Sequence, residues 1–251
     1  MSTEAQRARD WHHRAQMVIC DVVAPWAHGT VVRATRYPTY YDFNVVCVHD
    51  EPELSAASLI AFADEALDGL DHRRVDFDRA DVAETLAAGF ATAGWDTLRR
   101  VVMRHRGSRP GAPAGVARVD YDAAEHLRMA WLREDFPDLD FSGFPAVAKE
   151  VALRLGTETY AVHGDDGDAI GFAEVQRDGT SAEVRRVYVD AAHRGRGLGT
   201  LLTQAAMHAA GDADDLWILA DAQGRPQRLY ARLGFFPTWW TVHFQRLGCR
   251  A

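Results

Sequence analysis

The sequence predicts a mixed α/β protein (α+β, with a mixed sheet), and three features of its second half predict this class. Apolar and β-branched runs over residues 157–189, separated by Asp-Gly turns, are typical of an antiparallel meander. A turn with alternating glycines at 194–199 leads directly into an apolar-faced helix. A buried strand at 216–220, a helix and an alternating strand at 240–245 complete the pattern.

Composition and charge limit the classes of function. The chain has 251 residues, of which 36 are acidic and 28 basic, so its formal charge is −8. This charge gives no support to binding a polyanion such as nucleic acid. Residues 1–14 have no apolar signal core, and no apolar run approaches the roughly 18 residues of a membrane span. Cys20, Cys47 and Cys249 lie far apart, which favours reduced thiols in a cytoplasmic protein.

A seam divides the chain near residue 110. Residues 106–115 contain three glycines and two prolines, which sustain neither a helix nor the interior of a sheet. We therefore expect a smaller N-terminal domain over residues 1–110 and a second domain over residues 111–251.

The second domain is expected to start with a strand at 116–119. Asp120 or Asp122 can cap the helix that follows, which runs to about residue 135, and Gly156 is a typical stop for the next one. The remaining expected elements, in chain order, are strands at 157–163, 169–176 and 182–189, a helix at 198–210, a strand at 216–220, a helix at 226–233 and the final strand.

The first domain resembles a shortened copy of this ending. Its expected elements are strands within 31–48, a helix at 55–70, a strand at 74–77, a helix at 81–93 and a strand at 97–105. Gly94-Trp95 closes its last helix as Gly234-Phe235 closes the later one, which places Phe90 opposite Tyr230. No glycine lies between Asp42 and Gly69, so this half has no phosphate-binding turn. We interpret it as a degenerate copy without chemistry.

The segment most informative about chemistry is Arg194-Gly-Arg-Gly-Leu-Gly199. Its glycines let backbone N–H groups approach an anion without obstruction by a Cβ atom. The helix that starts there directs its unpaired N–H groups and positive dipole end at the same place. Arg194 and Arg196 add charge suited to a diphosphate. The alternative is a structural turn rich in glycine and arginine.

Two other phosphate motifs fit less well. A P-loop needs a lysine and then Ser or Thr after its last glycine, which Thr200-Leu201 does not supply. A dinucleotide fingerprint counted from Gly195 would need a glycine where Thr200 stands. Asp221, at the end of the next strand, could imitate the acidic residue that contacts a ribose, but too little chain follows for the remaining units of that fold.

Arg194–Gly199 resembles the R-G-x-G-[LIV]-[GA] signature of the GCN5-related N-acetyltransferase (GNAT) superfamily. Asp221–Phe235, which contains Leu229-Tyr230 and ends in Gly234-Phe235, is similar to the second signature of that family. The resemblance covers roughly residues 116–246, and the order of elements agrees with it. It implies a GNAT acyl-CoA N-acyltransferase fold, preceded here by the smaller degenerate GNAT-like half.

The resemblance also implies site residues. Tyr230 would protonate the leaving thiolate, and a phenol of pKa near 10 suits that task. The backbone around Val189 would stabilise the oxyanion. Val187, Tyr188 and Val189 would pair with the pantetheine arm of acetyl-CoA, and its pyrophosphate would bind the amides of Arg194, Gly195, Arg196, Gly197, Leu198, Gly199 and Thr200, with Asp221 as a further cofactor contact. The alternative for Tyr230 is a tyrosine that merely packs on the sheet.

The base and the acceptor site are less defined. Relatives that acetylate histones use a glutamate eleven residues before the signature arginine, and this count gives Glu183. Glu174 on the preceding strand is the second candidate, while a water chain or a solvated role for both glutamates stays open. The acidic, aromatic segment 134–141 would border the acceptor and suit a cationic amine, unless it is only a solvated loop. His12, His13 and His193 lack ligand spacing, so we interpret them as surface residues and expect no metal.

We therefore predict an acetyl-CoA-dependent N-acetyltransferase, in which a primary amine of a small, cationic acceptor attacks the thioester directly in a ternary complex. The alternatives are a non-catalytic acyl-CoA sensor, a protein or peptide N-acetyltransferase, and transfer of a longer acyl group. The second domain ends one strand short of the usual family pattern. The first half, or a partner chain in a homodimer, would supply that strand.

Overall fold

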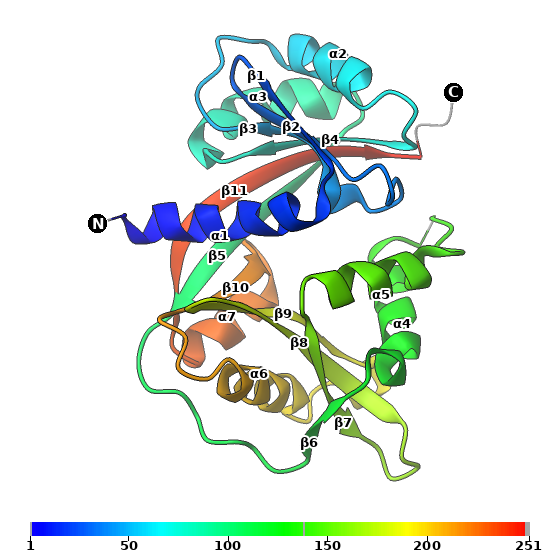
Figure 1. Cartoon of the computed structure of the whole chain (residues 1–251), viewed down its shortest axis with the longest axis vertical. Coiled ribbons are helices and arrows are strands. Elements are labelled where there is room, and N and C mark those ends of the chain that lie inside the picture. The colour runs from blue at the N-terminus through cyan, green and yellow to red at the C-terminus, as the bar shows by residue number, and fades with distance from the viewer. Residues whose placement is uncertain (1, 138, 249–251) are drawn as a thin grey trace. The chain divides into compact units, whose positions relative to one another are not determined.

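The computed structural model describes residues 2–137 and 139–248, so Asp138 and Cys249 lie outside the described residues. The chain divides into two compact units (Figure 1). Unit 1 comprises Met1–Val102, Ala220–Gly224 and Pro237–Ala251, and unit 2 comprises Met103–Leu219 and Arg225–Phe236. Unit 1 therefore includes two short segments from the later part of the chain. A single division near residue 110 does not reproduce these two units.

Unit 1 is a mixed sheet with helices. Its elements are α1 (Glu4–Ile19), β1 (Val22–Trp26), β2 (Gly29–Arg33), β3 (Asn44–Val48), α2 (Ala56–Ala66), β4 (His72–Phe77), α3 (Ala80–Thr92), most of β5 (Asp96–His105) and most of β11 (Phe235–Leu247). The strand order is β1-β2-β3-β4-β11-β5. Strands β1 to β3 are antiparallel, β3 and β4 are parallel, and β4 and β11 are antiparallel.

The two faces of this sheet differ in chemistry because side chains alternate along each strand. Val75 and Phe77 of β4 belong to the apolar core that packs with α2 and α3, where Phe90 stacks on Phe244 with ring centroids 4.0 Å apart. Asp76 and Asp78 point to the opposite, polar face, which α1 covers (Figure 1).

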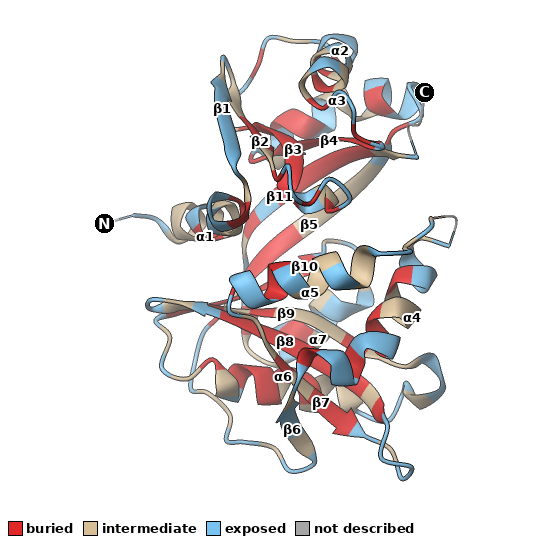
Figure 2. Ribbon diagram, turned by 45° about the vertical axis from the view of Figure 1, so that its right-hand side comes forward, coloured by how far each residue is buried: buried red, intermediate tan, exposed pale blue. Residues whose placement is uncertain are grey.

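Unit 2 contains the predicted meander and the predicted helices. Its elements are β6 (Val116–Val119), η2 (Tyr121–Ala124), α4 (Glu125–Asp135), α5 (Phe144–Arg154), β7 (Glu158–His163), β8 (Ala169–Asp178), β9 (Ser181–Val189), η3 (Ala191–His193), α6 (Leu198–Ala209), most of β10 (Asp215–Asp221) and α7 (Arg225–Arg232). Strands β6 to β9 are antiparallel, and β9 pairs with β10 in parallel. Figure 2 shows β8 largely buried and the edge strand β6 exposed. The mixed α/β class is confirmed.

Neither aspartate proposed as a helix cap at the start of unit 2 caps an α-helix. Asp120 precedes the short 3₁₀ turn η2 and makes no side-chain capping hydrogen bond, and α4 begins only after Ala124. The prediction of those caps is wrong because one 3₁₀ turn intervenes between strand and helix.

The last strand of the chain belongs mainly to unit 1. Val242 to Leu247 pair with Phe77 to His72 of β4 in antiparallel register. The first half of the chain therefore pairs with this strand, which is one of the two arrangements expected from the sequence. The same succession occurs twice along the chain: a meander, a helix, a parallel strand, a helix and another strand. This repetition supports the interpretation of unit 1 as a related half. None of the helices described is long and apolar enough to cross a bilayer.

Candidate active site

The site is built on a bulge in β9. Val175 pairs with Val184 and Ala173 pairs with Val187, so two residues of β9, Arg185 and Arg186, oppose the single residue Glu174 of β8. A bulge of this kind bends its strand and increases the local twist. Strand β9 therefore changes direction after Val184.

The bend coincides with the end of pairing between β9 and β10. Among the residues that the structure describes, their parallel register runs from Ser181–Asp215 only to Val184–Ile218, although β9 continues to Val189. Val187 to Val189 still pair with β8 on their other side. One edge of β9 is thus open, with alternating N–H and C=O groups that can pair with an extended, amide-containing chain.

A helix N-terminus without a side-chain cap follows this edge. Gly195 and Gly197 have φ values of +81° and +79°, a left-handed conformation that glycine adopts without strain. Gly197 is the N-cap of α6, makes no side-chain capping bond, and accepts the first helical hydrogen bond from Leu201 N–H. The preceding N–H groups, from Leu198 to Thr200, have no acceptor inside the helix, so they suit an anion.

Arg194 ties the turn to α4. Its Nη2 donates to Glu134 Oε2 at 2.6 Å and its Nε donates to the carbonyl of Val189 at 3.0 Å. Tyr188 donates to the other oxygen of Glu134 at 2.7 Å, and burial followed by this hydrogen bond raises the pKa of Tyr188 to about 12. The two donors hold the pKa of Glu134 below its usual value. Arg196 is exposed.

Tyr230 lies on α7, close to the start of α6. A Cβ atom placed on Gly199 would lie 3.6 Å from Leu229 Cδ1, so the helix that carries Tyr230 packs against the first turn of α6. The Tyr230 side chain is buried, and burial raises the pKa of its hydroxyl to about 12. Asp221 ends β10, where its carboxylate accepts from the N–H of Gln223 at 2.8 Å.

The two candidate bases share one face of the sheet. Glu183 pairs with Gln176, and directly opposed residues point the same way, so Glu183 lies on the face of Gln176 and Glu174. This is the face covered by α4, because Arg128 of α4 contacts Glu174, whereas α6 covers the other face (Figure 1). Glu183 is half-buried.

Glu174 is held by two arginines. Its Oε1 accepts from Arg128 Nε at 3.0 Å and its Oε2 accepts from Arg186 Nη1 at 2.9 Å, with no exposed surface left on the side chain. Burial raises the pKa of Glu174, but the guanidinium charges outweigh it and lower that pKa below its usual value. These contacts disfavour Glu174 as a general base, because a base must be free to take a proton.

A narrow pocket opens on the same face. Its wall is mostly apolar and aromatic, and it comes from η2, α4, α5 and β9; the lining residues are Tyr121, Glu125, Arg128, Met129, Trp131, Leu132, Phe144, Pro145, Ala148 and Arg186. The guanidinium of Arg128 lies 3.6 Å from the ring centroid of Tyr121, and that of Arg186 lies 5.3 Å from that of Trp131. The sequence analysis identified neither arginine as a site residue. Arg186 reaches this face because of the bulge, which the sequence does not indicate.

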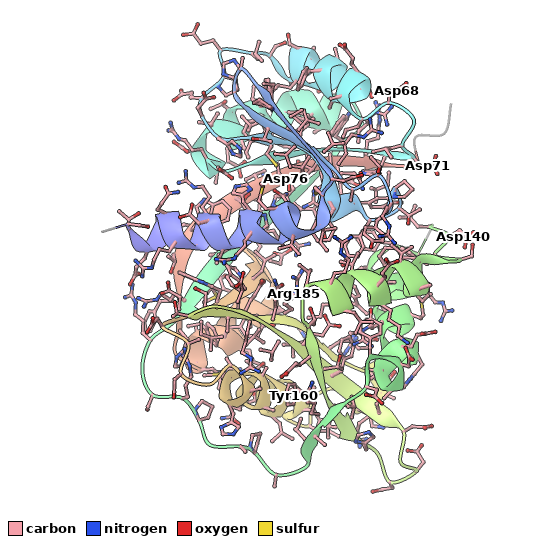
Figure 3. The ribbon with its side chains drawn as sticks, in the orientation of Figure 1. Asp68, Asp71, Asp76, Asp140, Tyr160 and Arg185 are labelled. Carbon is pink, nitrogen blue, oxygen red and sulfur yellow. The ribbon has the colours of Figure 1, made fainter. Side chains whose placement is uncertain are left out.

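The described part of the acidic segment 134–141, which runs from the end of α4 into the following loop, is less acidic in effect than its sequence indicates. Glu134 binds Arg194 and Tyr188, and Asp140 accepts from the N–H and hydroxyl of Ser142 at 2.9 and 2.7 Å. Asp140 is labelled in Figure 3, in the loop that follows α4. The proposed attraction of this loop for a cationic amine therefore has less support than its composition suggested.

The structure agrees with the sequence prediction for only one of the three histidines. His193 Nδ1 lies 3.2 Å from Asp190 Oδ1 inside its own turn, in keeping with a surface role. For His12 and His13 the prediction of isolated surface residues is wrong. Each groups with an aspartate and another histidine of unit 1, because the fold brings together β-strands far apart in sequence.

Comparison with known proteins identifies the fold around this site. The family described as "Acetyltransferase (GNAT) domain" matches residues 156–237, which include β7 to α7 and the whole glycine turn. The chain contains a GNAT acetyltransferase domain. No curated protein sequence matches the chain.

Solved structures extend the GNAT fold beyond the matched residues. A GCN5-related N-acetyltransferase from Kribbella flavida is 21% identical with a TM-score of 0.59, covering 98% of this chain and 96% of its own. One from Sphaerobacter thermophilus is 17% identical with a TM-score of 0.54, covering 95% and 84%. A conserved protein of Staphylococcus epidermidis is 12% identical with a TM-score of 0.69, covering 92% and 95%. At these identities the likeness concerns the fold alone.

Proposed function

We propose that the GNAT domain transfers an acetyl group from acetyl-CoA to the primary amine of a small acceptor, by direct attack in a ternary complex. The observation that carries this proposal is the open edge of β9 beyond Val184, directly followed by the uncapped start of α6. Together they offer one site for an extended amide chain and one for a diphosphate, in the order in which coenzyme A presents them.

The chain's own groups would divide the binding as follows. Backbone N–H groups of residues 194–200 would hold the pyrophosphate, since the helix dipole adds to their hydrogen bonds. Arg194 would either stay with Glu134 and fix the turn or turn outward to the phosphate, and Arg196 is already exposed to meet it. Val187 to Val189 would pair with the pantetheine amides, and a backbone N–H near Val189 would donate to the oxyanion.

Acetyl-CoA would supply a thioester, whose carbonyl carbon forms a bond to the acceptor nitrogen while its C–S bond breaks. The departing sulfur has a conjugate acid of pKa about 8.5–10. The Tyr230 hydroxyl, with its pKa raised to about 12, stays protonated at neutral pH and donates a hydrogen bond to the sulfur as charge develops. Because this phenol is a weaker acid than the thiol, proton transfer from Tyr230 to the thiolate is uphill, and it is completed when water returns a proton to Tyr230.

The attacking amine must lose one proton. Glu183 is the base we propose, acting directly or through water, because it lies half-buried on the same sheet face as the pocket. Glu174 instead fixes Arg128 and Arg186 beside that pocket. We assign it a positioning role.

The narrow pocket between α4, α5 and β9 supports a small acceptor over a protein one. Its apolar and aromatic wall suits an amine with an apolar body, and Glu125 is the one carboxylate among the described residues that line it. A cationic group would meet Glu125 but also two arginines, so we propose an acceptor with a single amine rather than a polycation.

The test is steady-state release of free thiol from acetyl-CoA with a panel of amines, comparing single amines of apolar body, polyamines and peptides. Preference for the single amines supports the proposal. Turnover only with peptides would favour the protein-acetylating alternative, and binding of acetyl-CoA without thiol release for any amine would favour the sensor.

A further inference from the structure

The polar face of the unit 1 sheet carries a cluster that the acetyl-transfer site does not use. His13 comes from α1, His49 follows β3, and Asp78 follows β4. His13 Nε2 lies 2.9 Å from Asp78 Oδ1, and His49 Nδ1 lies 2.9 Å from Asp78 Oδ2. One donor atom from each of the three residues lies within 4.8 Å of the other two.

The remaining nitrogen of each ring also has a partner. His13 Nδ1 lies 3.1 Å from Gln16 Oε1, and His49 Nε2 lies 3.1 Å from Thr30 Oγ1. Such outer contacts orient the ring of a metal-binding histidine and fix which nitrogen faces the ion. Here both rings are held with their other nitrogen directed at the same carboxylate.

The carboxylate is rigid and the histidines are accessible. The Asp78 side chain is 5% exposed, its backbone N–H donates to Val48 O at 2.9 Å, and its carbonyl accepts from Trp239 Nε1 at 2.8 Å. The side chains of His13 and His49 are 22% and 37% exposed. An ion can therefore enter from the histidine side, where water can complete its coordination.

We propose that His13, His49 and Asp78 bind one divalent transition-metal ion of the zinc type. Two imidazoles and one carboxylate suit Zn²⁺ or Co²⁺. Bonds of about 2.0–2.1 Å in a tetrahedral site place ligand atoms about 3.3 Å apart, so each imidazole, now 2.9 Å from its own Asp78 oxygen, would move back by a few tenths of an ångström as the ion enters. The ion would join α1 to the ends of β3 and β4, so its role in unit 1 is structural.

A second group on the same face shows what excludes a cation. One potential ligand atom from each of His12, Asp76 and His243 also lies within 4.8 Å of the other two, but the Arg74 guanidinium contacts both Asp76 and His243. Arg74 binds both oxygens of Asp76, at 2.7 and 3.1 Å, and donates to His243 Nδ1 at 2.5 Å. Asp76 is labelled in Figure 3. At the proposed site the Arg9 guanidinium lies with its Nε 3.9 Å from Asp78 Oδ2. It is close enough to weaken binding without filling the site.

The test is calorimetric titration of the full-length chain, freed of affinity tags and dialysed against chelator, with ZnCl₂. We expect about one ion per chain, and a loss of affinity of about 100-fold or more in His13→Gln and in His49→Gln. Arg9→Gln should tighten binding about two- to tenfold, because it removes a positive charge. His28→Gln is the matched control. The Nδ1 atom of His28 also lies 3.1 Å from an aspartate, Asp50, but neither residue belongs to the proposed metal site.

Two readouts remain if the histidine variants fold poorly. Wild-type protein loaded with Co²⁺ should show the intense visible absorption of four-coordinate cobalt, and Thr30→Val, which removes only the outer partner of His49, should weaken Zn²⁺ binding about tenfold. No heat with Zn²⁺, or equal affinity in wild type, His49→Gln and Thr30→Val, would overturn the proposal.

Discussion

Arg186 Nη1 lies 2.9 Å from Glu174 Oε2, where two residues of β9 oppose one residue of β8. The ion pair fills the bulge from the side of α4, and the same bulge turns β9 away from β10. One irregularity thus has two consequences: the edge of β9 beyond Val184, which we propose pairs with the coenzyme arm, is left open, and Arg186 joins the wall of the pocket.

Glu174 is expected to matter for stability. Glu174→Gln leaves the buried Arg128 and the partly buried Arg186 without their counter-charge, so unfolding free energy should fall by about 3–5 kcal/mol in denaturant titration. Glu183→Gln, on the neighbouring strand and half-buried, should change stability little but lower kcat at neutral pH. Equal stability of the two variants would contradict the positioning role of Glu174.

The pKa of Glu174 also predicts the direction of a pH effect. Because its folded pKa is lowered, the carboxylate stabilises the fold above the pKa of the unfolded chain, and that contribution is lost as the pH falls through the folded value. Thermal melts of wild type should therefore lose more stability on acidification than those of Glu174→Gln. Parallel losses in both proteins would argue that other carboxylates dominate.

Tyr230→Phe should keep coenzyme affinity and lose about 10²-fold or more in kcat, since it removes only the hydroxyl. Tyr160→Phe is a matched control, because that hydroxyl donates to Glu158 on the same strand, β7, apart from the site. With its pKa raised to about 12, Tyr230 should cause no decline in kcat below about pH 10. A Tyr230→Phe enzyme with full turnover would reject its assigned role.

The left-handed N-cap of α6 gives a prediction about coenzyme binding. Gly197→Ala strains the turn by roughly 1–2 kcal/mol and should weaken coenzyme A binding about tenfold by calorimetry. Gly143→Ala is the control, because Gly143 is also an N-cap with φ +81° and free space around it. A similar loss of coenzyme affinity in both variants would mean that strain alone, and not the site, is responsible.

A fragment of residues 112–251 should be insoluble or unfolded. It lacks β4, to which Val242 to Leu247 pair, and so exposes the apolar face of β11, including Phe244. Expression of the fragment, followed by sedimentation and circular dichroism, tests this. A soluble fragment with full acetyltransferase activity would show that the domain cut near residue 110 is sufficient.

Local sequence patterns predicted most helices and strands and the glycine turn. Features that depend on contacts between residues far apart in the sequence were not predicted. The Asp-Gly turns predicted the meander, and the glycine turn could be found in the sequence because Gly195 and Gly197 adopt left-handed conformations that favour glycine. The bulge at Arg185-Arg186 has no local sequence cue, since it depends on the register with β8. The cluster of His13, His49 and Asp78 also escaped prediction, because its ligands come from elements 65 residues apart.

The most direct test of the account is nuclear magnetic resonance of the ¹⁵N-labelled chain titrated with coenzyme A. We predict large amide shifts at residues 195–200 and at Val187 to Val189, with small shifts around the first two strands of the meander. Saturable binding that leaves the amides of Gly195, Gly197 and Gly199 unshifted would contradict the claim that the start of α6 holds the diphosphate.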